Sequence, residues 1–216
     1  MTRWQIAFLT AGLIVAALAV TVTQAGSGCC PGAAAKLKDD QSPPQTATQF
    51  TLTNYDGKEI SLADFKGKIV VLEWLNYDCP FVKYHYETET TMVNLAKKYA
   101  DKDVVWLGIN TTDYATPEAN KAFAEKHSAP YPILDDHAGN VGRAYQATNT
   151  PGMFVIDKEG KIVYRGAIDN APFGRLNEGQ TEKINYVDKA LAELTGGREV
   201  STPKTEPYGC TVKYAK

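Results

Sequence analysis

The chain has 216 residues, of which 44% are hydrophobic and 22% are charged. This composition is typical of a folded protein, and the length fits one domain with extensions better than two packed domains. The formal net charge of -2 excludes the basic surface that nucleic-acid binding requires, so we expect no nucleic-acid partner.

The first 25 residues have the pattern of an export signal: Arg3 precedes an apolar, uncharged run over residues 6–22, and small residues lead up to Ala25. We predict a signal peptide cleaved before Gly26. A retained membrane anchor and lipid attachment at Cys29 are the alternatives, although residues 26–28 lack the leucine-like residue usual before a lipidated cysteine. All three place the folded part in the periplasm or elsewhere outside the cytoplasm, with membrane contact only through an uncleaved N-terminal segment.

Residues 26–46 are rich in Gly, Ala, Pro and Ser, which predicts a flexible linker. The four cysteines lie at positions 29, 30, 79 and 210. Their spacing matches neither a disulfide framework nor a C-x-x-C or zinc-finger motif, so we expect no metal and no other cofactor.

Regular structure is predicted from Ala47. Residues 50–53 and 59–62 flank a turn and form a β-hairpin. Residues 68–75 form a near-continuous apolar, β-branched run, typical of a central strand buried on both faces. Cys79 and Pro80 follow, and apolar residues at helical spacing predict one long helix to about Tyr99.

The second half of the chain repeats this pattern in outline. It predicts a strand over 104–110, a helix over 117–127, an edge segment at 131–134, a short helix over 140–147, a hairpin of 153–157 with 161–166, and a helix over 181–194. A βαβα half followed by a ββα half predicts a three-layer α/β/α sandwich with a mixed sheet, over residues 47–197. Residues 198–216 form a C-terminal extension long enough to fold back over the domain.

Cys79 lies where a buried strand gives way to a helix. Backbone amides and the helix dipole favour an anion there, so we expect a stabilised thiolate, which Lys83 supports and Asp78 opposes. The alternative is a buried structural cysteine.

Two further features favour a reactive site. Glu73 lies inside an otherwise apolar strand, where a carboxylate is costly unless it keeps its proton or has a use, although a solvated position at the sheet edge is the alternative. Thr150-Pro151 precedes the strand at 153–157, and a proline at such a position often forms a cis turn that exposes backbone beside a site.

These residues resemble the thioredoxin fold over about residues 50–196. More closely, the chain is similar to the peroxiredoxin-like redoxins of the alkyl hydroperoxide reductase and thiol-specific antioxidant family, through Asn76-x-x-Cys79-Pro80-Phe81-Val82-Lys83-x-His85-Tyr86 and Gly209-Cys210-Thr211-Val212-Lys213-Tyr214. The resemblance implies that Cys79 matches the first cysteine of a thioredoxin pair and Val82 replaces the second. It implies that Pro151 is the cis-proline and Glu73 the buried acid that moves protons.

The chain also departs from the family pattern. True peroxiredoxins carry Pro-x-x-x-Thr-x-x-Cys, and here the corresponding positions hold Leu72 and Asn76. Dithiol exchange requires a second thiol nearby. Cys210 is the candidate, but the tail that carries it is equally consistent with a structural cap or with pairing to Cys29 or Cys30.

The other candidate residues are weaker. His85 falls about 240° around the helix from Cys79, which argues against a direct hydrogen bond. His127 and His137 are expected in loops, with Asp135-Asp136-His137 as a solvated turn, and Arg143 is expected at the surface.

The sequence therefore predicts an exported thiol-dependent oxidoreductase or antioxidant redoxin that uses Cys79, Glu73, Pro151 and Cys210. Its partner is a protein thiol or disulfide, or a peroxide. A redox-inactive thioredoxin-fold binding or scaffold module is the alternative, and a metal chaperone using Cys29, Cys30 or Cys210 ranks last.

Overall fold

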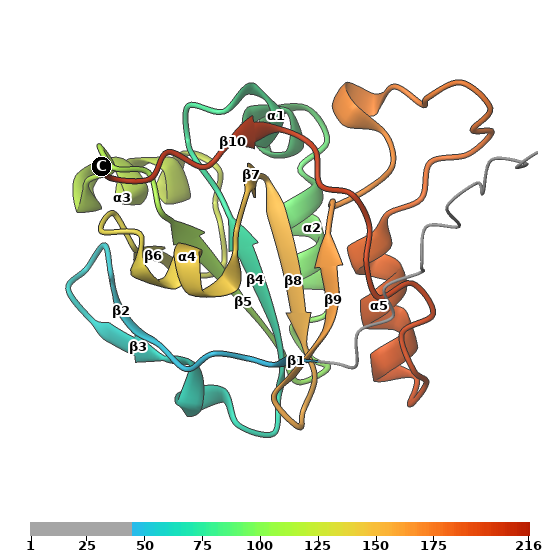
Figure 1. The fold of residues 1–216 in the computed structure, drawn as a ribbon, viewed down its shortest axis with the longest axis horizontal. Coiled ribbons are helices and arrows are strands. Elements are labelled where there is room, and N and C mark those ends of the chain that lie inside the picture. Colours follow the sequence, from blue (N-terminus) through green and yellow to red (C-terminus); the bar gives the residue numbers. More distant parts are fainter. Residues whose placement is uncertain (1–44) are drawn as a thin grey trace, which may run out of the picture. The chain divides into compact units, whose positions relative to one another are not determined.

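An eight-stranded mixed sheet is built around β4 (Ile69–Trp74), the apolar run that follows Gly67. The structure is a computed structural model that describes residues 45–216, and these fall within one compact unit (Figure 1). The predicted signal segment, most of the predicted linker, and Cys29 and Cys30 lie outside the described residues.

The strand order is β1-β9-β8-β4-β5-β6-β2-β3. β4 runs parallel to β5 and antiparallel to β8, so the sheet is mixed, as predicted. The remaining strands are β1 (Gln45–Thr46), β2 (Thr51–Asn54), β3 (Glu59–Ser61), β5 (Val104–Asn110), β6 (Ile133–Asp135), β7 (Asn149–Thr150), β8 (Gly152–Ile156), β9 (Lys161–Gly166) and β10 (Cys210–Thr211).

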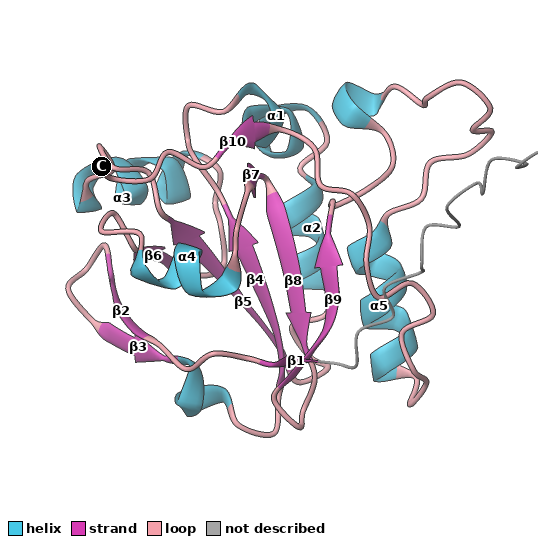
Figure 2. Ribbon diagram, viewed as in Figure 1, coloured by secondary structure: helices cyan, strands magenta, loops and turns pink. Residues whose placement is uncertain are grey.

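Helices cover both faces of the sheet, which confirms the predicted α/β architecture (Figure 2). Along β4, Val71 packs into one apolar cluster and Leu72 into the other, because successive side chains of a strand point to opposite faces. The first cluster includes side chains from α2 (Thr91–Lys98), α3 (Pro117–Lys126) and α5 (Tyr186–Thr195), and the second includes side chains from α4 (Asn140–Tyr145).

The predicted N-terminal hairpin is present as β2 and β3, with Leu52 opposite Ile60. A strand also forms earlier than expected, because β1 lies before the predicted domain start and pairs with β9. The expectation of an edge segment at 131–134 is wrong: β6 lies inside the sheet, between β5 and β2. Parallel pairing to β5 and antiparallel pairing to β2 satisfy its two sides.

The expected long helix to Tyr99 is broken into three pieces. α1 (Pro80–Lys83) continues into a π-helical turn, η2 (Tyr84–Thr88), and α2 starts only at Thr91. Thr90 adopts left-handed backbone angles (φ 53°), which a continuous helix cannot accommodate. The last helix is also shorter than predicted, because Asn185 caps α5 by accepting a hydrogen bond from the Asp188 amide.

The C-terminal extension folds back over the domain. Figure 1 shows this segment in red, passing beside α5 and crossing over β7 next to α1. β10 pairs antiparallel with β7, which places Cys210 opposite Thr150, and Val212 is buried in the second apolar cluster. Two short 3-10 turns, η1 (Leu62–Phe65) and η3 (Pro172–Gly174), complete the described elements.

None of the helices between residues 45 and 216 has the length and apolar character needed to cross a membrane.

Candidate active site

Cys79 lies at the start of α1, where the loop after β4 turns into the helical segment. Its side chain is buried, with 2% of the residue exposed. The Cys79 sulfur donates a hydrogen bond to the Thr150 carbonyl over 3.0 Å, and the Cys79 carbonyl accepts from the Lys83 amide over 2.9 Å. The thiol of Cys79 is therefore the donor in its contact with the Thr150 carbonyl.

Cys210 is brought to Cys79 by the tail. Both cysteines are free thiols, and the Cys210 side chain, which is partly exposed, hydrogen-bonds to the Cys79 sulfur. Burial, together with that hydrogen bond and the charge of a Cys79 thiolate, raises the pKa of Cys210 to about 11. The fold therefore brings together the side chains of two cysteines that lie far apart in the sequence.

The tail reaches this position by lying against the backbone before Pro151. The Thr150–Pro151 peptide bond is cis, as the sequence predicts. The Val212 amide donates to the Thr148 carbonyl over 2.9 Å. Gly209 adopts φ 115°, and a Cβ atom there would lie 2.2 Å from the Thr150 carbonyl oxygen, so only glycine fits.

Glu73 is fully buried in β4, on the sheet face of the first apolar cluster rather than at a solvated edge. Its carboxylate accepts hydrogen bonds from the Tyr86 hydroxyl (2.9 and 3.0 Å), the Trp106 indole (2.9 Å) and the Tyr131 hydroxyl (3.2 Å). Burial raises the pKa of Glu73 to about 7, and the hydrogen bonds only partly offset this effect. This buried carboxyl group therefore exchanges its proton near neutral pH.

The hydrogen bonds of Glu73 go to aromatic side chains, and one of these connects it to the helical segment of Cys79. Tyr86 lies in the π-helical turn that continues α1, and it belongs to the same apolar cluster as Cys79. Burial, and to a smaller extent the nearby negative carboxylate, raise the pKa of Tyr86. Tyr86 thus links Glu73 to the helical segment that begins at Cys79.

The two charges that flank Cys79 form a weak pair at the surface. The Lys83 ammonium and the Asp78 carboxylate are 3.8 Å apart, and both side chains are about half exposed. Exposed pairs of this kind contribute on the order of 0–1 kcal/mol.

His85 does not bond to Cys79, in agreement with the prediction, but it is not a surface residue. It is fully buried, and its ring nitrogens face the Thr91 hydroxyl (3.1 Å) and the Tyr208 hydroxyl (2.8 Å). Burial lowers the pKa of His85. Arg143 is exposed, as expected, and donates to the carbonyls of Ala138 and Ala215.

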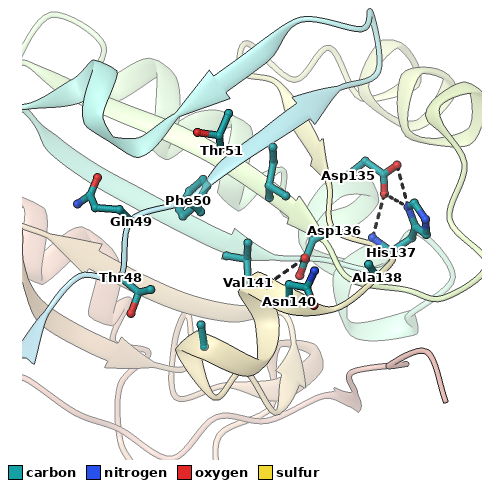
Figure 3. A pocket seen from close by; sticks show the side chains of 12 residues that line it. Thr48, Gln49, Phe50, Thr51, Asp135, Asp136, His137, Ala138, Asn140 and Val141 are labelled. Carbon is teal, nitrogen blue, oxygen red and sulfur yellow. Dashed lines mark hydrogen bonds and ion pairs between the residues drawn. The ribbon is translucent and has the colours of Figure 1, made fainter.

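The Asp135-Asp136-His137 segment is only partly the solvated turn that the sequence predicts. It lines a cavity of about 320 Å³ between α4 and the chain leading into β2 (Figure 3). His137 is exposed and bonds to Asp135, but Asp136 is buried and accepts hydrogen bonds from the Val141 and Gly142 amides. Asp136 therefore caps α4.

Two polar residues beside the cysteines carry no signal in the sequence. Asp169 follows β9 and is buried, and Tyr208 lies in the tail two residues before Cys210. The Tyr208 hydroxyl donates to the Asp169 carboxylate over 2.7 Å. Neither residue falls in a periodic segment, so no local pattern marks them.

The mixed sheet, the cysteine at the start of a helix and the cis-proline beside it define a thioredoxin-fold redoxin. The chain belongs to the AhpC/TSA family, whose model matches residues 43–165, more than half of the chain.

Two relatives come from different branches of thiol chemistry. The thiol-disulfide oxidoreductase ResA of Bacillus thuringiensis subsp. konkukian is 32% identical over 120 residues, covering 54% of this chain and 65% of the relative. The chloroplastic peroxiredoxin Q of Gentiana triflora is 30% identical over 144 residues, covering 59% of this chain and 58% of the relative. The chain thus spans less than two thirds of the length of either relative.

Solved structures support the same fold. An uncharacterized conserved protein from Geobacillus kaustophilus superposes with a TM-score of 0.71 at 34% identity, covering 80% of this chain and 92% of that protein. The peroxidoxin BcpB of Mycobacterium tuberculosis superposes with a TM-score of 0.53 at 22% identity, covering 72% and 97%, and supports the fold alone.

Proposed function

We propose that this chain is an exported thiol-disulfide oxidoreductase in which Cys79 and Cys210 alternate between a dithiol and a disulfide. One observation carries the proposal: the side chains of Cys79 and Cys210 are in hydrogen-bond contact, held there by the pairing of β10 with β7. Since exchange requires a second thiol within bonding reach, Cys210 takes the role that the missing C-x-x-C cysteine would fill.

The chemistry is a pair of thiolate attacks. The Cys79 thiolate attacks one sulfur of a partner disulfide, forms a mixed disulfide and releases the first partner thiolate, which takes up a proton. The Cys210 thiolate then attacks the Cys79 sulfur and releases the second partner thiol. The partner gains two electrons and two protons, and the chain is left with the Cys79–Cys210 disulfide.

Glu73 is proposed as the proton acceptor for this reaction. A carboxyl group with a pKa of about 7 takes up or gives back a proton at little cost near neutral pH. Tyr86 connects it by hydrogen bonds to the segment that carries Cys79. Pro151 is proposed to orient the Thr150 carbonyl, which accepts the hydrogen bond of the Cys79 thiol in the resting state.

The polar surroundings favour disulfide exchange over peroxide reduction. Within residues 45–216, the hydrogen-bond partners of the Cys79 sulfur are the Thr150 carbonyl and the Cys210 thiol. Peroxide cleavage develops negative charge on the leaving oxygen, and preorganised donors stabilise such charge. The Thr150 carbonyl cannot donate to that oxygen, whereas the second thiol that disulfide exchange requires is already beside Cys79.

The location outside the cytoplasm rests on the sequence of the first 25 residues, with Arg3 ahead of an apolar run. Disulfides, which are the substrates of this exchange, form and persist in an oxidising compartment. A mature protein that begins at Gly26 by N-terminal sequencing is expected, and a mature chain that keeps Met1 and stays in the cytoplasm would contradict export.

The test is a disulfide map of the protein after exposure to a disulfide substrate. We expect wild type to yield one intramolecular Cys79–Cys210 bridge by peptide mass spectrometry. Cys210→Ser should stop at a mixed disulfide on Cys79, and Cys79→Ser should lose turnover altogether. If the wild-type thiols stay reduced and turnover is absent, the binding or scaffold alternative holds. Turnover with hydrogen peroxide alone would reassign the substrate.

A further inference from the structure

A buried polar cluster lies next to the two cysteines and takes no part in the proposed exchange. His85 and Asp169 are fully or almost fully buried, and the Tyr208 hydroxyl bonds to both, over 2.8 Å to the His85 Nε2 and 2.7 Å to the Asp169 Oδ1. The Lys183 ammonium lies 3.1 Å from the Asp169 Oδ2 and also pairs with Glu89.

The donors and acceptors of this cluster determine the direction of the hydrogen bonds that Tyr208 makes. The single hydroxyl proton of Tyr208 goes to Asp169, so the Tyr208 oxygen accepts a hydrogen bond from the Nε2–H group of His85. The Lys183 ammonium lies against both the Asp169 and the Glu89 carboxylates. His85, Glu89 and Asp169 have the donor atoms of a metal site, all within 4.8 Å, but Lys183 already supplies the positive charge between the two carboxylates.

Three separate segments meet at Tyr208. His85 lies in η2, which continues the helical segment that starts at Cys79. Asp169 follows β9, and Tyr208 belongs to the tail two residues before Cys210. The Tyr208 ring also packs against Phe81, with ring centroids 5.8 Å apart. The tyrosine therefore ties the tail to the segment of Cys79 on the N-terminal side of Cys210.

This tie adds to two polar contacts that fix the tail before Cys210: the Asn149 side-chain amide donates to the Gly209 carbonyl over 3.2 Å, and the Ala167 amide donates to the Thr205 hydroxyl over 3.0 Å. β10 has only two residues, and the intervening Gly209 has more backbone freedom than any other residue type. A short flexible strand by itself leaves the Cys210 sulfur free to sample many positions, and disulfide formation has narrow geometric limits. A buried, charge-assisted hydrogen bond two residues away reduces that freedom.

We propose that Tyr208 is a positioning residue for Cys210: held by Asp169 and His85, it keeps the Cys210 sulfur within bonding distance of Cys79. This inference rests on the proposed Cys79–Cys210 exchange. It adds that Tyr208 and the β10–β7 pairing together set the effective concentration of the Cys210 thiol at Cys79.

The measurable quantity is the equilibrium of the protein with a glutathione redox buffer. Glutathione disulfide takes two electrons and two protons from Cys79 and Cys210, leaving two glutathione thiols and the protein disulfide. The equilibrium constant of this exchange reports how well the two protein thiols are held together. It is read from the fraction of bridged protein at each buffer ratio.

Tyr208→Phe removes only the hydroxyl group. Because a hydrogen bond to a charged group is stronger than one between neutral groups, we expect the constant to fall about 10-fold or more. Asp169→Asn keeps an acceptor for Tyr208 but removes its charge, and should produce a smaller fall, about 3-fold.

The chain offers a closely matched control. The Tyr99 hydroxyl donates to the Asp188 carboxylate over 2.7 Å, and Asp188 also pairs with a lysine, Lys98, over 2.6 Å. Tyr99→Phe therefore removes the same kind of bond from the junction of α2 and α5, two helices that carry neither cysteine. Both variants should lose thermal stability in the reduced form, but Tyr99→Phe should leave the glutathione equilibrium within about 2-fold of wild type.

A purely structural role for Tyr208 would lower the stability of the reduced and bridged forms equally, leaving the equilibrium constant unchanged. An unchanged constant in Tyr208→Phe, or an equal fall in Tyr99→Phe, would overturn the proposal. If Tyr208→Phe does not fold, Asp169→Asn decides the matter by the same criterion. Failure of wild type to form any bridge would instead remove the proposed function, and this inference with it.

Discussion

The two cysteines of the site are supported by two very different parts of the molecule. Cys79 belongs to the core: it follows the fully buried strand β4, starts a helical segment and is 2% exposed. Cys210 belongs to a tail that joins the domain through a two-residue strand, a tightly packed glycine, the buried Val212 and several polar contacts. Both regions meet at the Thr150 carbonyl. This group accepts a hydrogen bond from the Cys79 thiol and lies against Gly209.

The first thiol is therefore held by a core strand and the helical segment after it, whereas the second is held by a segment that we expect to open locally while the core stays folded. Segments with few buried apolar contacts open locally at a small fraction of the global unfolding free energy. A change that affects only the tail should therefore uncouple the two thiols without unfolding the sheet.

Gly209→Ala should have the largest effect on the contact between the tail and the core. A Cβ atom there would meet the Thr150 carbonyl at 2.2 Å, in a backbone conformation (φ 115°) that side chains rarely adopt. Overpacking and left-handed strain together cost about 4 kcal/mol, more than a two-residue strand can offset. We expect the tail to detach, the Cys79–Cys210 equilibrium constant to fall about 100-fold or more, and alkylation of Cys79 by iodoacetamide to accelerate.

The matched control is Gly57→Ala, which changes another glycine of positive φ (78°) that has nothing within 4 Å of the added Cβ atom. It should show the conformational cost alone and leave the thiols coupled. Equal thiol behaviour in Gly209→Ala and Gly57→Ala would show that the tail does not depend on its contact with Thr150.

Much of the Cys79 side could be predicted from the sequence, because local patterns specify it. The apolar run before Cys79, Pro80 after it, the buried Glu73 and the cis bond at Pro151 are all short-range signals, and the structure shows each of them. The break at Thr90 could not be predicted, since the apolar spacing continues through it while the backbone turns left-handed.

The Cys210 side could not be predicted, because its position depends on contacts between residues far apart in the chain. Residues 198–209 have no periodicity, and their path is set by pairings such as Thr205 with Ala167 and Tyr208 with Asp169. The sequence therefore left Cys210 as one candidate partner among three. The angle of His85 from Cys79 gives no hint of its contact with the tail.

Glu73→Gln tests the protonation of the buried carboxyl group in β4. The folded protein holds the Glu73 proton up to about pH 7, whereas the unfolded chain loses it near the ordinary glutamate pKa of 4.5. Folding stability contributed by this group is therefore present below about pH 4.5 and lost as the pH rises to about 7, a change of about 3 kcal/mol. The glutamine variant has no such proton to lose, so relative to wild type it should gain about 3 kcal/mol between pH 4.5 and pH 8.

Urea unfolding of both proteins at several pH values measures this gain. Glu159→Gln, in the exposed turn between β8 and β9, provides a control that should follow wild type within about 0.5 kcal/mol. A wild-type and Glu73→Gln difference that does not vary with pH would show that Glu73 is ionised in the folded state throughout, and would remove it as the proton acceptor.

The smallest expected effect concerns which sulfur of the bridged protein an outside thiol attacks. In the bridged protein the Cys210 sulfur lies on the partly exposed tail and the Cys79 sulfur in the core, so access favours attack on Cys210. The proposed exchange run in reverse requires the other attack, in which an outside thiol bonds to the Cys79 sulfur and expels Cys210.

Adding glutathione to the bridged protein and quenching by alkylation distinguishes the two attacks. Because forward and reverse exchange pass through the same mixed disulfide, we expect glutathione on Cys79 about three times more often than on Cys210. Peptide mass spectrometry reads this ratio directly, and Cys79→Ser and Cys210→Ser loaded separately with glutathione calibrate the two peptides. A preference for Cys210 would mean that access alone decides the attack, so that the tail thiol and not the core thiol meets the partner.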